Sequence, residues 1–152
     1  MILQCILGVL GVIPIENPIV MKGTVIKGFG RGGKLLGCPT ANLPADDHVL
    51  DQMEMGVYIG FAKLRDEIFK TVISVGNNPH FGNEKKTVEP HLLHEFKSDF
   101  YGEELSISIC GFIRYMAKFN GLEELIQAIQ SDIKIGQSAL DVEPFVKAKQ
   151  LL

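Results

Sequence analysis

The chain has 152 residues, of which 46% are hydrophobic and 22% charged, a composition that suits one globular domain with a single buried core. Its net charge of -3 gives no overall positive charge for binding nucleic acid or an anionic membrane. The cysteines, Cys5, Cys38 and Cys110, are odd in number and form no Cys-x-x-Cys pair, which argues against a disulfide framework or a thiolate zinc site. This cysteine usage favours a reducing compartment, so we expect a cytoplasmic protein. A monomer is the expected oligomeric state.

The chain begins with an apolar, uncharged segment, MILQCILGVLGVIPI. A secretory signal would have a similar apolar region, but here no Lys or Arg precedes it and no small-x-small cleavage site follows. The segment is also shorter than the roughly 20 residues that a membrane span needs. We expect residues 1–17 to be an apolar arm packed on a domain of residues 18–152, or an unusual start of the reading frame, with a targeting signal as the alternative.

Beyond Gly23 the chain has the pattern of short strands separated by Gly, Pro and Asn. β-Branched and aromatic residues gather in segments that turn residues bound on each side. These expected strands are Thr24–Gly28, Gly56–Leu64, Phe69–Val75, Val88–Phe96 and Leu105–Ile113. In the last strand, Leu105, Ile107 and Ile109 alternate with serines, which predicts an antiparallel sheet with one buried side. Five or more short strands indicate a small barrel or sandwich.

One helix is predicted near the C-terminus, in the segment LEELIQAIQSDI. Its apolar residues recur at steps of three and four, so they form a stripe that we expect to pack on the core. Asn120 is the expected N-cap, and Glu123 could complete a capping-box-like pair with it. The stripe residues are Leu122, Leu125, Ile126, Ile129 and Ile133.

The glycine-rich stretch GFGRGGKLLGCPTAN, residues 28–42, nearly matches two phosphate-binding patterns. Its glycines spell G-x-G-x-x-G, but Gly37 and Pro39 exclude the helix that must follow in a dinucleotide-binding fold. It also matches the first seven positions of a Walker A loop, yet a leucine follows the lysine where a Ser or Thr must hold Mg²⁺. Neither pattern therefore applies in detail.

The chemistry of this stretch still suits a phosphate. Closely spaced glycines let backbone N–H groups approach an anion, and Arg31 and Lys34 add cationic donors. Thr40 and Asn42 are two residues apart, so in an extended segment their side chains point to one face. Hydroxyl and amide oxygens are hard ligands that could complete the shell of Mg²⁺ together with phosphate oxygens and waters. An ordinary proline-containing turn is the alternative.

Residues 28–42 resemble the signature of the riboflavin kinase (flavokinase) family, in which a glycine-rich loop leads into Pro-Thr-Ala-Asn. Three further stretches resemble family motifs in the same order: GNNPHF at 76–81, EPHLLH at 89–94 and DFYG at 99–102. The similarity covers about Gly23 to Leu140, and four ordered motifs make a chance match improbable. The single-domain length resembles the stand-alone kinase of eukaryotes.

The resemblance implies a mainly β fold, a six-stranded antiparallel Greek-key barrel with a C-terminal α-helix, which agrees with the strand pattern. It also implies that ATP phosphorylates the ribityl 5'-hydroxyl of riboflavin, giving FMN and ADP. The implied metal is Mg²⁺, with Zn²⁺ or Mn²⁺ as alternatives. The implied partners are the small-molecule substrates riboflavin and ATP, with no nucleic acid and no membrane.

Carried over residue by residue, the resemblance makes Glu89 the catalytic base and assigns the metal to Thr40 and Asn42. Phosphoryl transfer depends mostly on positioning and charge stabilisation, and a carboxylate beside the accepting hydroxyl can take its proton. A strand carboxylate paired with Lys85 or Lys86 is the alternative for Glu89. The implied ATP-binding residues are Gly28, Lys34, Thr40, Leu92, His94 and Tyr101, and the implied flavin-binding residues are Arg114 and Phe119.

The run His91-Leu-Leu-His94-Glu95 raises the question of a zinc site. Residues three apart on a strand point to opposite faces, so the two histidines cannot share one ion without a bulge. The helical zinc-binding pattern H-x-x-E-H is also absent from this run. We expect no histidine metal site there.

The segment after Arg114 departs from the family, which commonly continues with Pro-Glu where this chain has Tyr115-Met116. None of the changes touches the implied metal ligands or base, so we expect altered flavin affinity before lost catalysis. A catalytically impaired flavin- or nucleotide-binding module of the same fold is the alternative function. A barrel that binds single-stranded nucleic acid is disfavoured, because aromatics make up only 8% and the net charge is negative.

Overall fold

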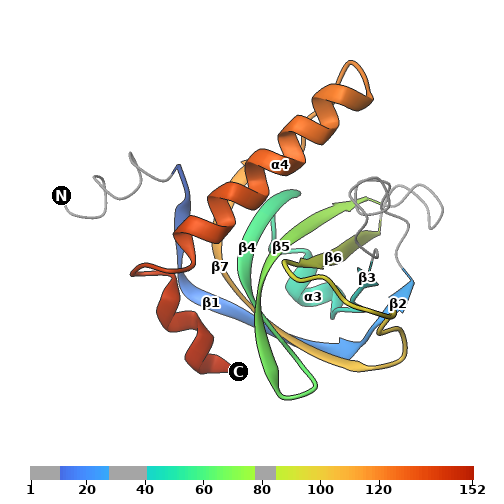
Figure 1. Cartoon of the computed structure of the whole chain (residues 1–152), viewed down its shortest axis with the longest axis vertical. Helices are drawn as coiled ribbons and strands as arrows, with labels where there is room; N and C mark the ends of the chain where they lie inside the picture. The colour runs from blue at the N-terminus through green and yellow to red at the C-terminus, as the bar shows by residue number, and fades with distance from the viewer. Residues whose placement is uncertain (1–10, 28–40, 78–84) are drawn as a thin grey trace.

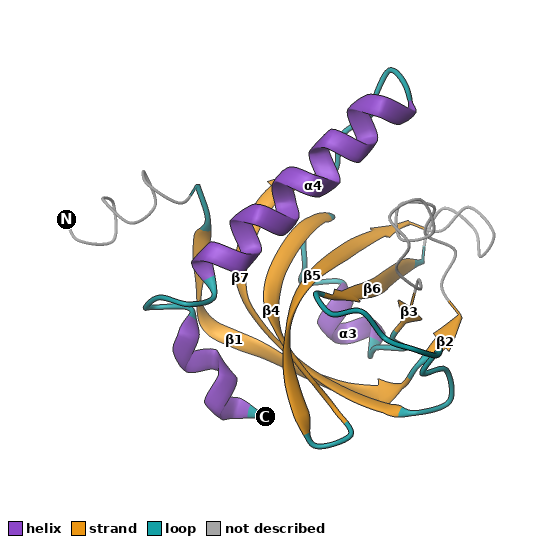
Figure 2. Ribbon diagram, viewed as in Figure 1, coloured by secondary structure: helices purple, strands orange, loops and turns teal. Residues whose placement is uncertain are grey.

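A computed structural model describes residues 11–27, 41–77 and 85–152 of the chain (Figure 1). Strands dominate these ranges, and the helices lie outside the sheet or at its end (Figure 2). The strands are β1 (Ile13–Thr24), β2 (Ile26–Lys27), β3 (Ala41–Asn42), β4 (Gly56–Leu64), β5 (Glu67–Asn77), β6 (Lys86–Leu92) and β7 (Glu104–Tyr115). The helices are α3 (Asp47–Leu50), α4 (Leu122–Ala139) and the 3₁₀-helix η2 (Val146–Leu151).

The strands close into a barrel. A five-stranded antiparallel sheet has the order β1-β7-β4-β5-β6, and β2 pairs with β3. Only Val25 separates β1 from β2, and an antiparallel bridge from Leu43 to Val88 joins the end of β3 to β6. Strands β2 and β3 therefore link the two edges of the larger sheet. If β1 and β2 are counted as one bent strand, the described residues form the six strands that the family resemblance implies.

The chain order of the strands is of the Greek-key type, because β7 returns to lie between β1 and β4. The predicted strand Gly56–Leu64 coincides with β4, and the predictions for 69–75 and 105–113 fall inside β5 and β7. The expected continuation of β6 to Phe96 is wrong. The strand ends at Leu92, because the chain then turns back and the N–H of His94 donates to the carbonyl of Leu92 at 2.9 Å.

The first strand was not predicted from the sequence. β1 pairs antiparallel with β7, with an irregular stretch between Pro14 and Ile19. Residues 13–17, expected in the arm, therefore belong to a strand of the barrel, and Val12 just before them is fully buried. Proline lacks the backbone N–H that a strand ladder uses, so Pro14 and Pro18 hide the strand in the sequence.

Two apolar clusters fill the molecule, one on each face of the sheet. The inner cluster lies inside the barrel and includes Leu105, Ile107 and Ile109, all fully buried, as their alternation predicts. The prediction of a single buried side is wrong in this region, because Ser108 on the opposite face is buried too. Its hydroxyl donates to the carbonyl of Ala148 in η2 at 3.0 Å. The outer cluster, under α4 and η2, includes Val57, Ile59, Val72, Cys110, Leu140 and Phe145.

Helix α4 is held to the barrel by its C-terminal half. Gly136 and Ala139 are buried there, and Ile133 packs on the outer cluster. The ammonium of Lys70 on β5 donates to the carbonyl of Gln137 at 2.9 Å, where the helix dipole favours a cation, and it also pairs with Asp141 at 2.7 Å.

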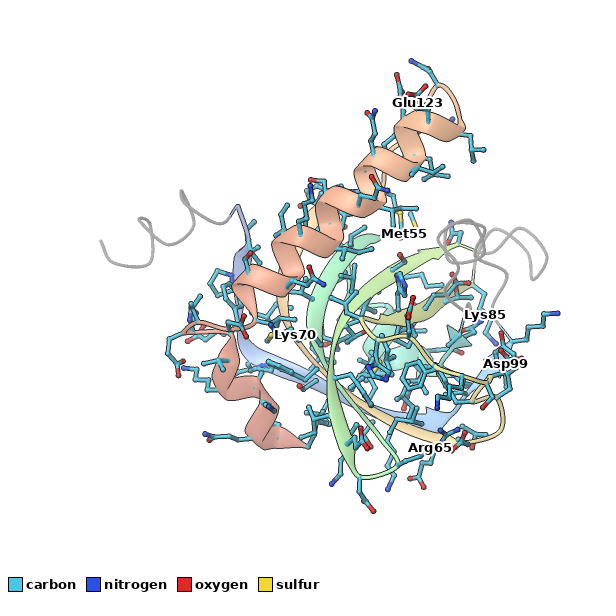
Figure 3. The ribbon with its side chains drawn as sticks, in the orientation of Figure 1. Met55, Arg65, Lys70, Lys85, Asp99 and Glu123 are labelled. Carbon is cyan, nitrogen blue, oxygen red and sulfur yellow. The ribbon has the colours of Figure 1, made fainter. Side chains whose placement is uncertain are left out.

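The N-terminal half of α4 points away from the barrel, with Glu123 near its tip (Figure 3). Leu122 is 55% exposed, so the predicted stripe packs on the core only in part. The predicted cap is also wrong, because Gly121 is the N-cap and makes no side-chain cap bond. The carboxylate of Glu124, one residue beyond Glu123, accepts from the N–H of Asn120 at 3.1 Å instead. In the described ranges, no helix combines the length and apolar character needed to cross a membrane.

Candidate functional site

The strand register gathers polar residues on the outer face of the barrel. Arg114 on β7 is paired with Val57 on β4, Val57 with Ser74 on β5, and Ser74 with Glu89 on β6. Paired residues on neighbouring strands point to the same face, and Val57 belongs to the outer cluster. Glu89 and Arg114 therefore lie on one face, with three strand intervals, or about 14 Å, between their backbones.

Asn42 extends this line beyond Glu89. The antiparallel bridge from Leu43 to Val88 has an N–O distance of 2.9 Å. The next position of an antiparallel register sets Asn42 opposite Glu89, on the face opposite to Leu43, whose side chain belongs to the inner cluster. We name Arg114, Val57, Ser74, Glu89 and Asn42 the outer row.

Val57 and the small residue Ser74 lie between the two charged members of the outer row. Gly76 occupies the next outward position along β5. A methyl group at Gly76 would come within 3.3 Å of the Cε atom of Met116, so this methionine lies close over the glycine. The sheet surface beside Glu89 therefore carries little side-chain bulk.

Arg114 is fixed from two sides. Its Nε lies 3.1 and 3.3 Å from the two carboxylate oxygens of Asp132 on α4, and its Nη2 lies 2.8 Å from Oδ2. Its Cζ also lies 5.5 Å from the ring centroid of Phe119, within range of a cation–π contact. Arg114 and Phe119, predicted together, do lie together. Asp132 was missed, although a carboxylate three residues after Ile129, on the packed side of a helix, was an available signal.

Glu89 is half-buried on β6. The alternative that pairs it with Lys86 is not supported, because the ammonium of Lys86 donates to the carbonyls of Leu50 and Met53 at 3.3 and 2.7 Å. These bonds tie the end of α3 to β6. Lys85 is exposed at the start of the strand.

An aromatic cluster follows the end of β6. The ring of His94 lies 4.9 Å from that of Phe69 and 4.8 Å from that of Phe96, and Phe96 lies 5.0 Å from Phe100. His94 is exposed, whereas Tyr101 is half-buried against the inner cluster. The side chain of Leu92 is buried in the inner cluster, away from the surface that His94 presents. Phe69, Phe96 and Phe100 were not predicted as site residues.

His91 lies on the outer face of β6, one outward position beyond Glu89. Its Nε2 is buried and has no hydrogen-bond partner among the described residues. Burial lowers the pKa of this imidazole below its ordinary value, because the charged form loses contact with water.

A pocket of about 210 Å³ opens between the β2–β3 pair and the start of β6. Asn42 is one of its lining residues although only 5% of Asn42 is exposed. Its amide oxygen is the kind of hard neutral ligand that Mg²⁺ accepts beside phosphate oxygens, so this residue fits the expected metal. Gly28, Lys34 and Thr40 lie outside the described residues. The pocket is lined by Ile26, Asn42, Leu43, Pro44, Ala45, Leu50, Lys85, Lys86, Thr87 and Val88.

Comparison with known families assigns the fold and these motifs to one group of proteins. The sequence model of the riboflavin kinase (flavokinase) family matches residues 15–140. The chain belongs to the riboflavin kinase family. This match extends over the strands of the barrel, the outer row and helix α4.

Individual members of the riboflavin kinase family agree with this assignment. The chain is 42% identical over 136 residues to a riboflavin kinase of Homo sapiens, covering 88% of each protein. It is 49% identical over 140 residues to a bifunctional riboflavin kinase/FMN phosphatase of Arabidopsis thaliana, covering 90% of this chain but 37% of the plant protein. A crystal structure of riboflavin kinase from Trypanosoma brucei superposes with a TM-score of 0.68 at 28% identity, covering 89% of this chain and 86% of that one.

Proposed function

We propose that this chain transfers the γ-phosphoryl group of ATP to the ribityl 5'-hydroxyl of riboflavin, giving FMN and ADP. The observation that carries the proposal is the outer row, in which a carboxylate, an amide and an arginine from distant parts of the sequence share one face. Family membership supports the same reaction, because relatives at 42% and 49% identity are named riboflavin kinases.

Glu89 is the proposed base. Its carboxylate accepts the proton of the 5'-hydroxyl while the new O–P bond forms, an effect worth roughly 10² to 10⁴ in rate. The register that sets Asn42 beside Glu89 supports this role, since the hydroxyl must meet the phosphates where the base can reach it. Asn42 and Thr40 would hold Mg²⁺, which, when bound, neutralises charge on the phosphates.

The aromatic cluster and the residues after it are the proposed nucleotide side. An exposed ring such as His94, already packed on Phe69 and Phe96, offers a surface on which a purine can stack. Tyr101 lies in the same connection between β6 and β7. The proposed contacts of Gly28 and Lys34 with the phosphates, through backbone N–H groups and the lysine ammonium, rest on the glycine-rich composition of that loop.

Arg114 and Phe119 are the proposed flavin side. Ser74 and Gly76 put little side-chain bulk on the sheet surface beside Glu89, which suits a flat ring with a chain that runs toward the base. Arg114 contacts Phe119 in this chain, which has Tyr115-Met116 after the arginine, and this contact together with relatives named riboflavin kinases favours an active kinase over an impaired binding module.

The decisive experiment is FMN formation from riboflavin, ATP and Mg²⁺, resolved by chromatography. We expect Glu89→Gln to lower kcat by roughly 10² to 10⁴ while calorimetry finds ATP binding little changed. Glu104→Gln is the matched control, because Glu104 pairs with Lys22 at 2.6 Å at the opposite end of β7. Absence of FMN with the parent protein would reject the kinase, and parental turnover in Glu89→Gln would reject the base.

Two finer points are part of the proposal. We also propose that the protein acts as a monomer. The oxygen donor of Asn42 suits Mg²⁺ over a softer ion, with Mn²⁺ and Zn²⁺ as the ions to compare in the same assay.

A further inference from the structure

The contact between Arg114 and Asp132 is unusual in its burial. Only 6% of the Asp132 side chain is exposed and 27% of the Arg114 side chain. The carboxylate receives Nε and Nη2 of the guanidinium side by side, which is the bidentate geometry that fixes the plane of an arginine. This contact joins the end of β7 to α4.

Asp132 lies where the packed C-terminal part of α4 meets the part of the helix that extends beyond the barrel. On its C-terminal side the helix is held by Gly136, Ala139 and the bond from Lys70, whereas on its N-terminal side the helix leaves the barrel (Figure 1). A buried ion pair contributes little net stability compared with apolar residues of the same volume. The apolar contacts of the outer cluster already hold the helix to the barrel. The ion pair between Arg114 and Asp132 is therefore better explained by a role other than stabilising that contact.

The guanidinium keeps donors for a ligand. Of its five N–H groups, the contacts with Asp132 use Nε and one on Nη2, and Nη1 reaches the carbonyl of Tyr115 at a long 3.4 Å. One N–H on each terminal nitrogen remains. Asp132 binds one edge of the guanidinium and Phe119 packs on its face, so the orientation of Arg114 is fixed before substrate binds.

We propose that Asp132 is a positioning residue for riboflavin. It holds the guanidinium of Arg114 so that the remaining N–H groups meet acceptor atoms of the flavin at the end of the outer row opposite Glu89. This inference rests on the proposed function. It makes a carboxylate on α4, which touches no substrate, a determinant of flavin affinity through Arg114 alone.

The test is steady-state kinetics of Asp132→Asn. Loss of charge-assisted hydrogen bonds predicts a rise in KM for riboflavin of roughly 10- to 100-fold, with KM for ATP within about twofold of the parent. Asp141→Asn is the matched control, since Asp141 pairs with Lys70 just after the same helix and should leave both constants unchanged. In an Arg114→Met background, Asp132→Asn should have no further effect on KM for riboflavin.

Arg114→Lys provides a second variant should Asp132→Asn fail to fold, because it keeps the charge but loses the bidentate fork, and it should raise the same KM. A variant with parental KM for riboflavin and only a lower melting temperature would overturn the inference in favour of a structural ion pair.

Riboflavin binding, measured by flavin fluorescence, distinguishes failure of the proposed kinase function from failure of the proposed positioning role of Asp132. If the parent binds riboflavin but forms no FMN, the proposed function fails, and weaker binding in Asp132→Asn still supports the positioning role. If the parent forms FMN and the variant binds riboflavin as tightly as the parent, the positioning role fails alone. If the parent neither binds riboflavin nor forms FMN, both fail.

Discussion

The same strands build the inner and outer faces of the barrel, but the two faces carry residues with different roles. On β6, Val88 is fully buried in the inner cluster, whereas its neighbour Glu89 belongs to the outer row. On β5, Val75 and Ser74 divide in the same way. At these positions, residues that stabilise the core and residues of the proposed site are one residue apart along a strand, so substitutions at Val88 or Val75 should affect mainly stability and substitutions at Glu89 or Ser74 mainly activity.

The largest expected loss of stability comes from a substitution on the inner face, and it tests the difference between the two faces. Ile107→Ala should lower the free energy of unfolding by about 2 to 5 kcal/mol, because it opens a cavity at a fully buried site. Urea denaturation measures the loss. At a temperature where the variant is folded, kcat should stay within about twofold of the parent.

Ser106→Ala is the control for that experiment, since Ser106 is half-buried on the other face of the same strand. It should change stability by less than about 1 kcal/mol. A large loss of kcat in folded Ile107→Ala would break the separation of the two faces.

A middle-sized effect is expected on the outer face. Gly76→Ala should raise KM for riboflavin roughly tenfold, or about 1.4 kcal/mol, because the added methyl group raises the sheet surface and pushes on Met116 at 3.3 Å. Stability should change little, since the methionine end is flexible. Steady-state kinetics in the Gly76→Ala, Met116→Ala double variant should recover part of the loss, and no recovery would remove Met116 from the explanation.

The smallest effect concerns His91. Burial lowers its pKa in the folded protein, so the unfolded chain takes up a proton first, near the ordinary value of about 6.5. The stability that the neutral imidazole of His91 contributes is therefore fully present above about pH 6.5 and is lost as the pH falls toward the lower folded pKa. His91→Gln should reduce this pH dependence, measured by urea denaturation at pH 7 and at pH 5.

Sequence patterns predicted the strands best where alternation and turn residues coincide. β4 was predicted residue for residue, because a clear β-branched and aromatic run lies between turn residues. β1 was missed, because Pro14 and Pro18 interrupt its pattern and its apolar start resembles a leader. β6 was predicted too long, because the aromatic residues after Leu92 favour strands in general but here pack on one another beyond the turn.

The residues of the candidate site were also predicted only in part. Motifs identify Glu89, Asn42 and Arg114 one at a time, but their meeting on one face depends on the register between strands, which no sequence period reveals. Asp132 was hidden because the helix was interpreted through its apolar stripe. Its partner stands eighteen residues earlier on another element, so the pair follows from tertiary packing alone.

Strands β3, β4, β5, β6 and β7 each give the outer row a single residue, which limits the mutations that the protein can tolerate in evolution. Deleting one residue of β5 ahead of Ser74 would turn Ser74 toward the interior and bring Val75 out beside Glu89. One missing codon would thus spoil the packing and the reaction together, whereas an exchanged side chain spoils one. We expect insertions and deletions to be tolerated in the connections and eliminated within the strands.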